Sequence, residues 1–250
     1  MAQITAIINQ KGGVGKSTTS HALAAGLSML AFKVLLIDMD SQGNLSLSVG
    51  ADKAAVSTME VLKQQAKAEE AIQPIGGLDI IPASISLAGA DMQLVEMGKE
   101  YRLKEALEPI KDKYDYIIID TPPALGILTI NALTAADNLI IPAQADIYSL
   151  DAIGQLASTV NAVRQYTNKN LYIKGILLTR FSDRAILSRD LADLIEQTAA
   201  TLSTKVFKAT IREAISIKEA QAKQQDIFTY SRNSKVAADY LQLVYEFLEA

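Results

Sequence analysis

Short apolar runs rich in β-branched residues alternate along the chain with longer segments in which apolar residues recur every three or four positions. The first pattern predicts buried strands and the second predicts one-sided helices. Strands are expected at residues 4–8, 34–37, 78–81, 116–119, 138–142, 172–178 and 206–210, and long helices at 19–30, 149–165, 187–202 and 237–248. This alternation is typical of βαβ units and predicts an α/β fold, a doubly wound, mainly parallel sheet with helices on both faces.

No linker, repeat or change of composition divides the 250 residues, so we expect a single domain over residues 1–250. The polar segment 57–73 predicts small surface helices after the second strand. In the last expected helix, positions 241, 244, 245 and 248 are apolar and predict its packing face. The first expected strand begins near residue 4, so we expect no N-terminal helix-turn-helix domain.

A glycine-rich segment follows the first expected strand and leads directly into the first expected helix. Its residues are Lys11, Gly12, Gly13, Val14, Gly15, Lys16, Ser17 and Thr18. This strand–loop–helix context is typical of a P-loop, whose glycines let backbone N–H groups converge on a phosphate. Lys16 is expected to contact the phosphates and Ser17 to bind Mg²⁺. Gln10 stands where the usual pattern has its first glycine, and a purely structural glycine turn is the plainer alternative.

With its second lysine, Lys11, this segment resembles the deviant Walker A group of P-loop ATPases. That group includes the ParA/Soj partition proteins, MinD and the nitrogenase iron protein. The resemblance implies an ATP-dependent sandwich dimer in which Lys11 reaches the phosphates of the partner's nucleotide. A cation supplied in this way stabilises charge on the transferring phosphoryl group, as an arginine finger does at roughly 10³–10⁵ in rate.

Three aspartates end two of the expected strands. Asp38 and Asp40 lie two residues apart at the end of the second strand, so they point to the same side, toward the crevice where α/β sheets bind ligands. Asp120 ends an apolar run in the manner of a Walker B strand. The resemblance implies that Asp40 orients the attacking water. It also implies that Asp38, Asp120 and Ser17 lie at the metal ion. Lys11, Lys16 and Asp40 are therefore the predicted catalytic residues.

The expected nucleotide is ATP. A guanine-specific P-loop protein would carry Asn-Lys-x-Asp late in the chain, whereas the nearest segment, 168–171, ends in leucine. The resemblance places two short segments beside the adenine. Their residues are Thr179, Arg180, Ile211 and Arg212.

The formal net charge is −4, so the whole chain is not a polycation that coats nucleic acid. Residues 172–235, however, hold 11 basic and 7 acidic side chains. The resemblance implies nonspecific binding of double-stranded DNA through basic residues in this part of the dimer. The residues selected for that role are Arg189, Arg212, Lys218 and Lys235.

The resemblance thus predicts a weak intrinsic ATPase that segregates DNA, with a ParB-type partner that stimulates hydrolysis. The absence of cysteine excludes the cluster of the nitrogenase iron protein and fits a cytoplasmic protein, and the resemblance implies association with the nucleoid. A MinD-like spatial regulator is disfavoured, because residues 236–250 contain no lysine or arginine for a membrane surface, and no signal peptide or span is expected. A metabolic ATP-dependent ligase or amidase of the same superfamily stays open.

Overall fold

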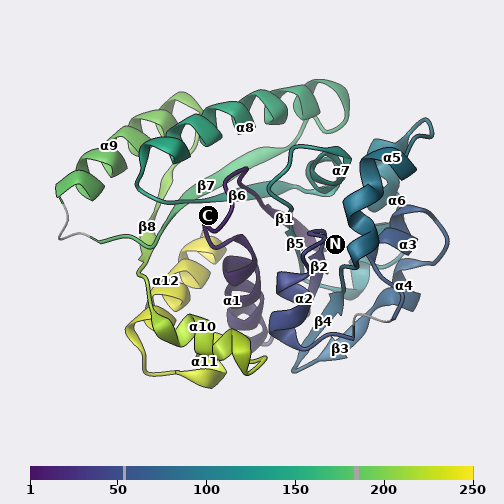
Figure 1. The fold of residues 1–250 in the computed structure, drawn as a ribbon, viewed down its shortest axis with the longest axis horizontal. Coiled ribbons are helices and arrows are strands. Elements are labelled where there is room, and N and C mark those ends of the chain that lie inside the picture. Colours follow the sequence, from purple (N-terminus) through teal and green to yellow (C-terminus); the bar gives the residue numbers. More distant parts are fainter. Residues whose placement is uncertain (53–54, 183–185, 250) are drawn as a thin grey trace.

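The computed structural model describes residues 1–52, 55–182 and 186–249, with the side chains of 186–189 outside the description. At its centre lies an eight-stranded sheet in the order β3-β4-β2-β5-β1-β6-β7-β8 (Figure 1). The strands are β1 (Gln3–Ile7), β2 (Val34–Asp38), β3 (Gln73–Ile75), β4 (Leu78–Ile81), β5 (Tyr116–Asp120), β6 (Asn138–Ala143), β7 (Tyr172–Thr179) and β8 (Val206–Ile211). All neighbouring strands pair in parallel except β3 and β4. The expected doubly wound α/β fold is confirmed.

Seven of the strands lie within one or two residues of their expected positions, whereas β3 was missed. It is a three-residue edge strand with Pro74 at its centre, too short to show an alternating pattern. Gly76 and Gly77 join it to β4, both with positive φ (57° and 84°), as a two-residue hairpin turn of this hand requires.

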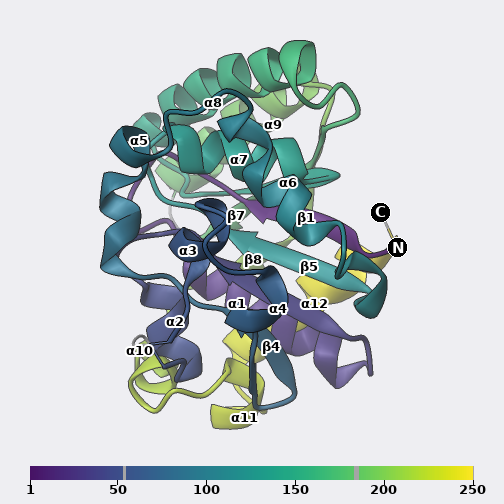
Figure 2. The same cartoon turned by 90° about the vertical axis from the view of Figure 1, so that its right-hand side faces the viewer.

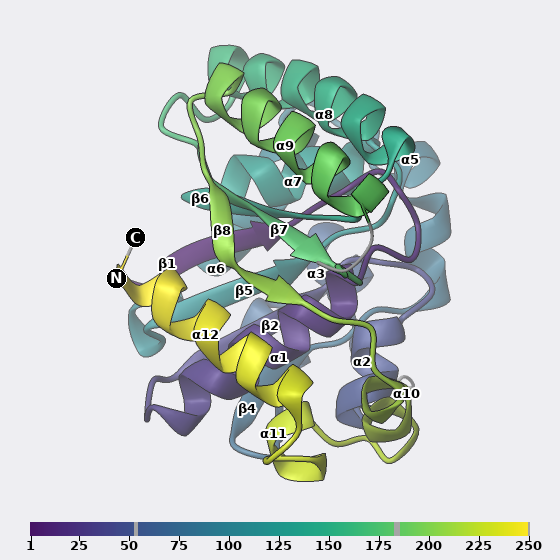
Figure 3. The ribbon, with the colours of Figure 1, turned by 90° about the vertical axis from the view of Figure 1, so that its left-hand side faces the viewer.

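Helices cover both faces of the sheet. One face carries α3 (Thr58–Leu62), α6 (Arg102–Leu107), α7 (Ile127–Ala135), α8 (Ile147–Tyr166) and α9 (Ile186–Thr201). The other carries α1 (Lys16–Met29), α2 (Asn44–Val49), α10 (Ile215–Ala222), α11 (Ile227–Tyr230) and α12 (Lys235–Glu249). Figure 3 shows α8 beside α9 on the first face and α1 beside α12 on the second. The β-branched strand residues are therefore buried between two helical layers.

Segment 57–73 forms α3 and α4 (Ala68–Ala71), but the prediction of surface helices was wrong in one respect. Met59, Val61 and Leu62 of α3 are buried in the core. Ser57 and Glu60 form a capping box that starts α3 and satisfies two of its free backbone N–H groups. Figure 2 shows α3, α4 and α6 together beside the β4 edge.

The packing face of α12 differs from the predicted one. Tyr245 is 50% exposed, whereas Tyr240, Leu243, Val244 and Phe247 are buried. The helix packs against both α1 and β8, so its buried stripe follows Tyr240 rather than Leu241. The i, i+3, i+4, i+7 spacing was correct in kind but displaced by one position.

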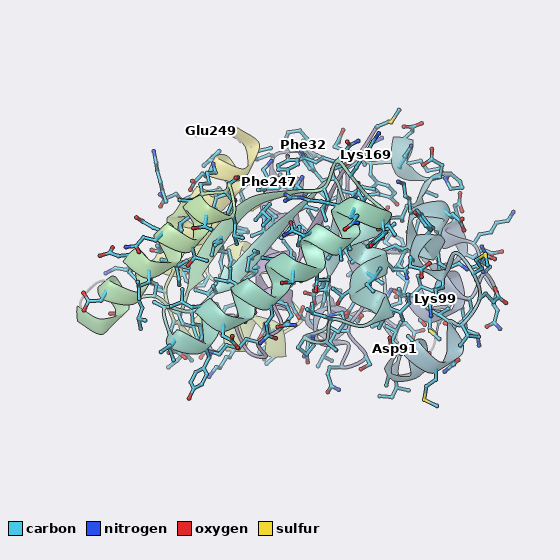
Figure 4. The ribbon with its side chains drawn as sticks, turned by 90° about the horizontal axis from the view of Figure 1, so that it is seen from above. Phe32, Asp91, Lys99, Lys169, Phe247 and Glu249 are labelled. Atoms are coloured by element: carbon cyan, nitrogen blue, oxygen red, sulfur yellow. The ribbon has the colours of Figure 1, made fainter. Side chains whose placement is uncertain are left out.

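Two opposite edges of the sheet differ in character. At one edge Phe32, Tyr116 and Phe247 stack edge to face, with ring centroids 5.1 and 5.7 Å apart. Figure 4 shows Phe32 and Phe247 together at this edge and Asp91 at the opposite one. The opposite edge holds the carboxyl ends of the parallel strands, from which every motif singled out in the sequence begins. The parallel pairing thus gathers distant segments into one site.

The only histidine, His21, lies in α1 and is 8% exposed. Burial lowers its pKa from 6.5 to about 4, although Asp226 partly opposes the shift. The unfolded chain therefore binds the extra proton first, and stability falls as the pH drops from about 6.5 to about 4. We expect the titration of His21 to lower the free energy of unfolding by about 3 kcal/mol between these two pH values. Urea unfolding at pH 7 and pH 4.5 checks this, since His21→Gln should lose correspondingly less stability than the wild type. Parallel losses in the two proteins would contradict the assignment.

Candidate functional site

The chain turns sharply between β1 and α1. Gly13 and Gly15 have φ values of 75° and 88°, and Gly15 is the N-cap of α1. A side chain would be strained at both positions. A Cβ built on Gly12 or Gly13 would meet nothing within 4 Å, so the concave side of this loop faces open space. The loop and the N-terminus of α1 therefore present backbone N–H groups to any anion in that space.

That space is a cavity of about 500 Å³ at the carboxyl edge of the sheet. It is lined by Gly12, Gly13, Gly15, Lys16, Ser17, Thr18, Asp40, Gln42, Asn44, Leu47, Ser48, Pro123, Arg180, Gln221 and Ala222. The structure thus brings the predicted Lys16, Ser17 and Asp40 together around one cavity. Its size and its mixture of one buried cation, hydroxyls and a carboxylate suit a phosphorylated ligand with a metal ion.

Lys16 is buried, with 7% of its surface exposed, and its Nζ donates to the Lys11 carbonyl oxygen at 3.2 Å. Burial lowers the pKa of Lys16, while the nearby carboxylates of Asp120 and Asp40 favour its charged form. A compact ammonium group next to the open side of the loop is suited to the terminal phosphate oxygens of a nucleotide.

Asp38 and Asp120 are paired residues of the adjacent strands β2 and β5, and both are fully buried. Burial raises the pKa of each carboxyl; the charge of Asp40 adds to the rise at Asp38, and the charge of Asp38 adds to the rise at Asp120. For Asp120, hydrogen bonds from Ser17 and Ser20 and the charge of Lys16 oppose this rise. Among the described residues, Asp120 Oδ2 is a buried oxygen that lacks a hydrogen-bond partner. An unsatisfied carboxylate oxygen beside the Ser17 hydroxyl fits Mg²⁺, which prefers hard oxygen ligands and retains several waters.

Asp38 lies behind the cavity rather than on its wall. Its Oδ2 accepts from the Ser46 N–H at 2.8 Å and the Ser46 hydroxyl at 2.7 Å, and its Oδ1 accepts from the Asp40 N–H at 3.1 Å. Asp38 thereby fixes the backbone from which Asp40 projects. Its predicted place at the metal stays a prediction.

Asp40 is 8% exposed and lies on the cavity wall, where its Oδ1 accepts from the Gln42 N–H at 3.0 Å. Asp40 lines the same cavity as Lys16 and Ser17. A carboxylate in this position can accept a hydrogen bond from a water beside a terminal phosphate. The water-orienting role of Asp40 stays a prediction.

A second, smaller cavity of about 120 Å³ adjoins the first. Gly15, Thr18, Arg180 and Gln221 line both, so an elongated ligand can run from the loop to the ends of β7 and β8. The predicted base contacts all line this second cavity. They are Thr179, Arg180, Ile211 and Arg212, joined there by Val14.

Some residues of the site were missed in the sequence. Gln221 lines both cavities, and its Nε2 donates to the Thr18 hydroxyl at 3.0 Å. Glu213 and Ile217 line the second cavity. These residues lie more than 190 positions beyond the P-loop and belong to no phosphate-binding motif. The positive charge and the Gln-rich stretch around α10 were the only signals near them.

Lys11 is part of the glycine-rich segment, but its side chain lies outside both cavities. Its Nζ forms an ion pair with Asp146 and lies 3.4 Å from Gln144 Oε1, both in the segment between β6 and α8. The predicted contact of Lys11 with nucleotide in a partner subunit stays a prediction. Asp146 was not predicted from the sequence.

The residues selected for DNA binding have different surroundings. Arg212 forms a bidentate ion pair with Asp239, with N–O distances of 2.6 and 2.7 Å. Lys218 and Lys235 are exposed, and Arg189 lies in α9 with its side chain outside the described residues. Within the described part of the chain, no helix is both long and apolar enough to span a bilayer.

Comparison with known proteins identifies the family of the chain. A family model described as an AAA domain matches residues 2–173. The chain is 43% identical to the sporulation initiation inhibitor protein Soj of Bacillus subtilis, over 98% of both chains. The chain belongs to the ParA/Soj family of deviant Walker A P-loop ATPases. The resemblance stated from the sequence is confirmed.

Two solved structures extend the comparison of this ParA/Soj family member. A cobyrinic acid a,c-diamide synthase from Mycobacterium smegmatis with bound ADP and magnesium has a TM-score of 0.86 and 34% identity, covering 100% of this chain and 95% of that one. A plasmid partition protein from Borrelia burgdorferi bound to AMPPNP has a TM-score of 0.85 and 28% identity, covering 100% and 99%. Both share the fold over nearly their whole length.

Proposed function

We propose that this chain is a DNA-partition ATPase that uses ATP and Mg²⁺ to close a face-to-face homodimer. The ATP-bound dimer binds double-stranded DNA nonspecifically on the nucleoid, and a ParB-type partner stimulates its weak intrinsic hydrolysis. The observation that carries this proposal is the cavity shared by Lys16, Ser17 and Asp40 in a chain 43% identical to Soj. Cargo DNA is a chromosome or plasmid.

Different residues of the site would have different roles in ATP hydrolysis. The loop N–H groups and Lys16 bind the phosphates, and the second cavity receives the adenosine end. Ser17 and Asp120 would hold Mg²⁺, which neutralises charge on the phosphates when bound. Asp40 orients the attacking water from the cavity wall. Gln221, which donates a hydrogen bond to Thr18, lies where the two cavities meet.

Exposed apolar side chains around the cavity support a dimer on this face. Leu47, on the cavity wall, is 54% exposed, and Ile147 and Tyr148 at the start of α8 are 68% and 74% exposed. Ile215, beside the second cavity, is 75% exposed. Exposed apolar residues gathered at one edge are typical of an association surface. A second copy suits it, because the γ-phosphate in one cavity would then contact both subunits and couple association to ATP.

Exposed lysines support nonspecific DNA binding. Lys218 and Lys235 project from α10 and from the start of α12, and dimerisation would double the number of such cations on one duplex. Arg212 contributes less on this account, because Asp239 already neutralises it.

Duplex binding tests the proposal directly. We expect a fluorescent duplex of arbitrary sequence to bind with ATP and Mg²⁺ and to be released with ADP or without nucleotide. Because phosphates are the contacts, affinity should fall steeply with salt, by roughly 10³–10⁵ between 50 and 200 mM if six to ten phosphates are neutralised. Lys218→Gln and Lys235→Gln should each weaken binding equally on all sequences and, because each substitution removes two cations from the dimer, reduce the salt slope by about 2. Fluorescence anisotropy measures all of these quantities.

Lys33→Gln is the matched control, since Lys33 is exposed at the opposite edge of the sheet, before β2. Binding that ignores the nucleotide would contradict the switch. No binding at any salt, with rapid ATP turnover on a small carboxylate, would instead favour an amide-forming enzyme of the kind named for the Mycobacterium smegmatis structure.

A further inference from the structure

The side chain of Lys11 is held by the segment that joins β6 to α8. Its Nζ forms an ion pair with Asp146 and lies 3.4 Å from Gln144 Oε1. The Tyr148 ring centroid lies 5.9 Å from the same Nζ. This ammonium group therefore has a carboxylate, an amide oxygen and an aromatic ring beside it, all from one short segment.

The two carboxylate oxygens of Asp146 accept hydrogen bonds from different groups. Its Oδ1 accepts from the Ser149 N–H at 2.9 Å and caps the N-terminus of α8, while its Oδ2 accepts from Lys11. Partial burial tends to raise the pKa of Asp146, but the hydrogen bonds from Lys11 and Ser149 outweigh it and the pKa is lowered. The carboxylate is thus a fixed anchor at the N-terminus of a 20-residue helix.

The backbone of the glycine-rich loop is attached to the same segment. Asn9 Nδ2 donates to the Pro142 carbonyl oxygen at 2.7 Å, and Asn9 Oδ1 accepts from the Lys11 N–H at 2.9 Å. Gln144 Nε2 donates to the Gly13 carbonyl oxygen at 3.3 Å. These bonds fix the root of Lys11 while leaving its side chain outside the phosphate cavity of its own subunit.

We propose that Asp146 is a positioning residue that latches Lys11 in cis and so sets the protein concentration at which nucleotide drives association. This rests on the proposed function, an ATP-driven homodimer, together with the role that the family resemblance implies for Lys11 at the nucleotide of the partner subunit. The ion pair with Asp146 is 26% and 30% exposed at its two side chains, so it is weak enough to exchange. A latched subunit is not competent to close, and apparent affinity falls in proportion to the competent fraction.

Two substitutions separate the latch from the helix cap. Asp146→Asn and Asp146→Ser both retain an N-cap acceptor for Ser149, so α8 remains capped. The first removes the charge, and the second also shortens the side chain so that it no longer reaches Lys11. Asp151→Asn is the matched control, because Asp151 is exposed on α8 and contacts Gln155 rather than Lys11.

The first measurement is amine labelling of the nucleotide-free protein. A brief pulse of an acetylating reagent, read by mass spectrometry, gives the labelling rate of Lys11 relative to the exposed Lys33. We expect Asp146→Ser to raise this ratio about two- to fivefold over the wild type, since an ion pair of this exposure is worth at most roughly a factor of five. Asp151→Asn should leave the ratio unchanged. An equal ratio in all three proteins would overturn the latch.

The second measurement is self-association with AMPPNP and Mg²⁺ by sedimentation. If the latch reduces the competent fraction about two- to fivefold in each subunit, two subunits must open it, and the dimer Kd of the Asp146 variants should fall about 4- to 25-fold. High salt should bring wild type and variants together, because it screens the pair. A Kd equal to that of wild type at low salt would refute the regulatory role.

The two proposals fail in different ways. A wild type that stays monomeric with AMPPNP overturns the proposed dimer and with it the control of association by Asp146. The labelling ratio then still decides whether Asp146 holds Lys11. A wild type that dimerises with unaltered variants leaves the proposed function intact and removes the latch.

Discussion

Lys11→Ala should lose nucleotide-driven association and hydrolysis while it still binds ATP. The side chain of Lys11 lies outside both cavities of its own subunit, so its removal leaves the contacts of Lys16 and Ser17 with the phosphates in place. If Lys11 acts across the dimer, as the family resemblance implies, its loss removes a cation from the transferring phosphoryl group. Cations supplied in trans are worth roughly 10³–10⁵ in rate, so hydrolysis should fall to the background. Sedimentation with AMPPNP and phosphate release with ATP measure both effects.

Lys16→Ala is the contrasting variant, since Lys16 lies inside the cavity and its loss should abolish nucleotide binding itself. Lys33→Ala controls for the loss of one positive charge. A Lys11→Ala protein that still dimerises with AMPPNP would exclude the action of Lys11 across the interface. The same variant lacks the contacts of Lys11 with Asp146, Gln144 and Tyr148, so any change in its stability reports these contacts together.

The sheet was predictable because its strands carry their own signal. Runs such as 116–119 and 138–142 are apolar and β-branched, and burial on both faces leaves them continuous. Helix α7 was missed for the related reason that it is buried nearly all round, so its residues show no polar side. Edge strand β3 was missed because three residues around Pro74 carry no period. Local sequence thus predicts strands buried on both faces and helices with one solvated face, but neither a helix buried nearly all round nor a strand of three residues.

The residues of the site likewise fall into those that a local pattern predicts and those that it does not. The phosphate loop, Asp40 and Asp120 follow directly from strand ends, since parallel pairing brings those ends to one edge. Gln221 and Asp146 could not be found in this way. Gln221 contacts Thr18, and Asp146 contacts Lys11. In both pairs the partner lies more than 130 residues away in the sequence. Such contacts depend on how helices α8 and α10 pack, and no local pattern records that.

Asp40→Asn should slow hydrolysis while it preserves nucleotide-driven association. Asp40 lies on the cavity wall with Lys16 and Ser17, and a carboxylate that orients or deprotonates the attacking water contributes about 10²–10⁴ in rate. The asparagine amide oxygen can still accept from the Gln42 N–H, so the loop after β2 keeps its hydrogen bond. The variant should therefore accumulate as an ATP-bound dimer that remains on DNA. Single-turnover phosphate release and the lifetime of the DNA complex give the two readouts.

Gln42→Ala is the control for the same wall, because Gln42 lines the cavity but carries no charge. Its hydrolysis should change much less than that of Asp40→Asn. Hydrolysis at the wild-type rate in Asp40→Asn would remove Asp40 from the reaction and leave only its structural bond to the Gln42 N–H. Loss of association in Asp40→Asn would mean that the charge of Asp40 acts on the dimer rather than on water. A long-lived DNA complex with slow phosphate release is the outcome that follows from its position beside Lys16, because a trapped nucleotide keeps both subunits closed.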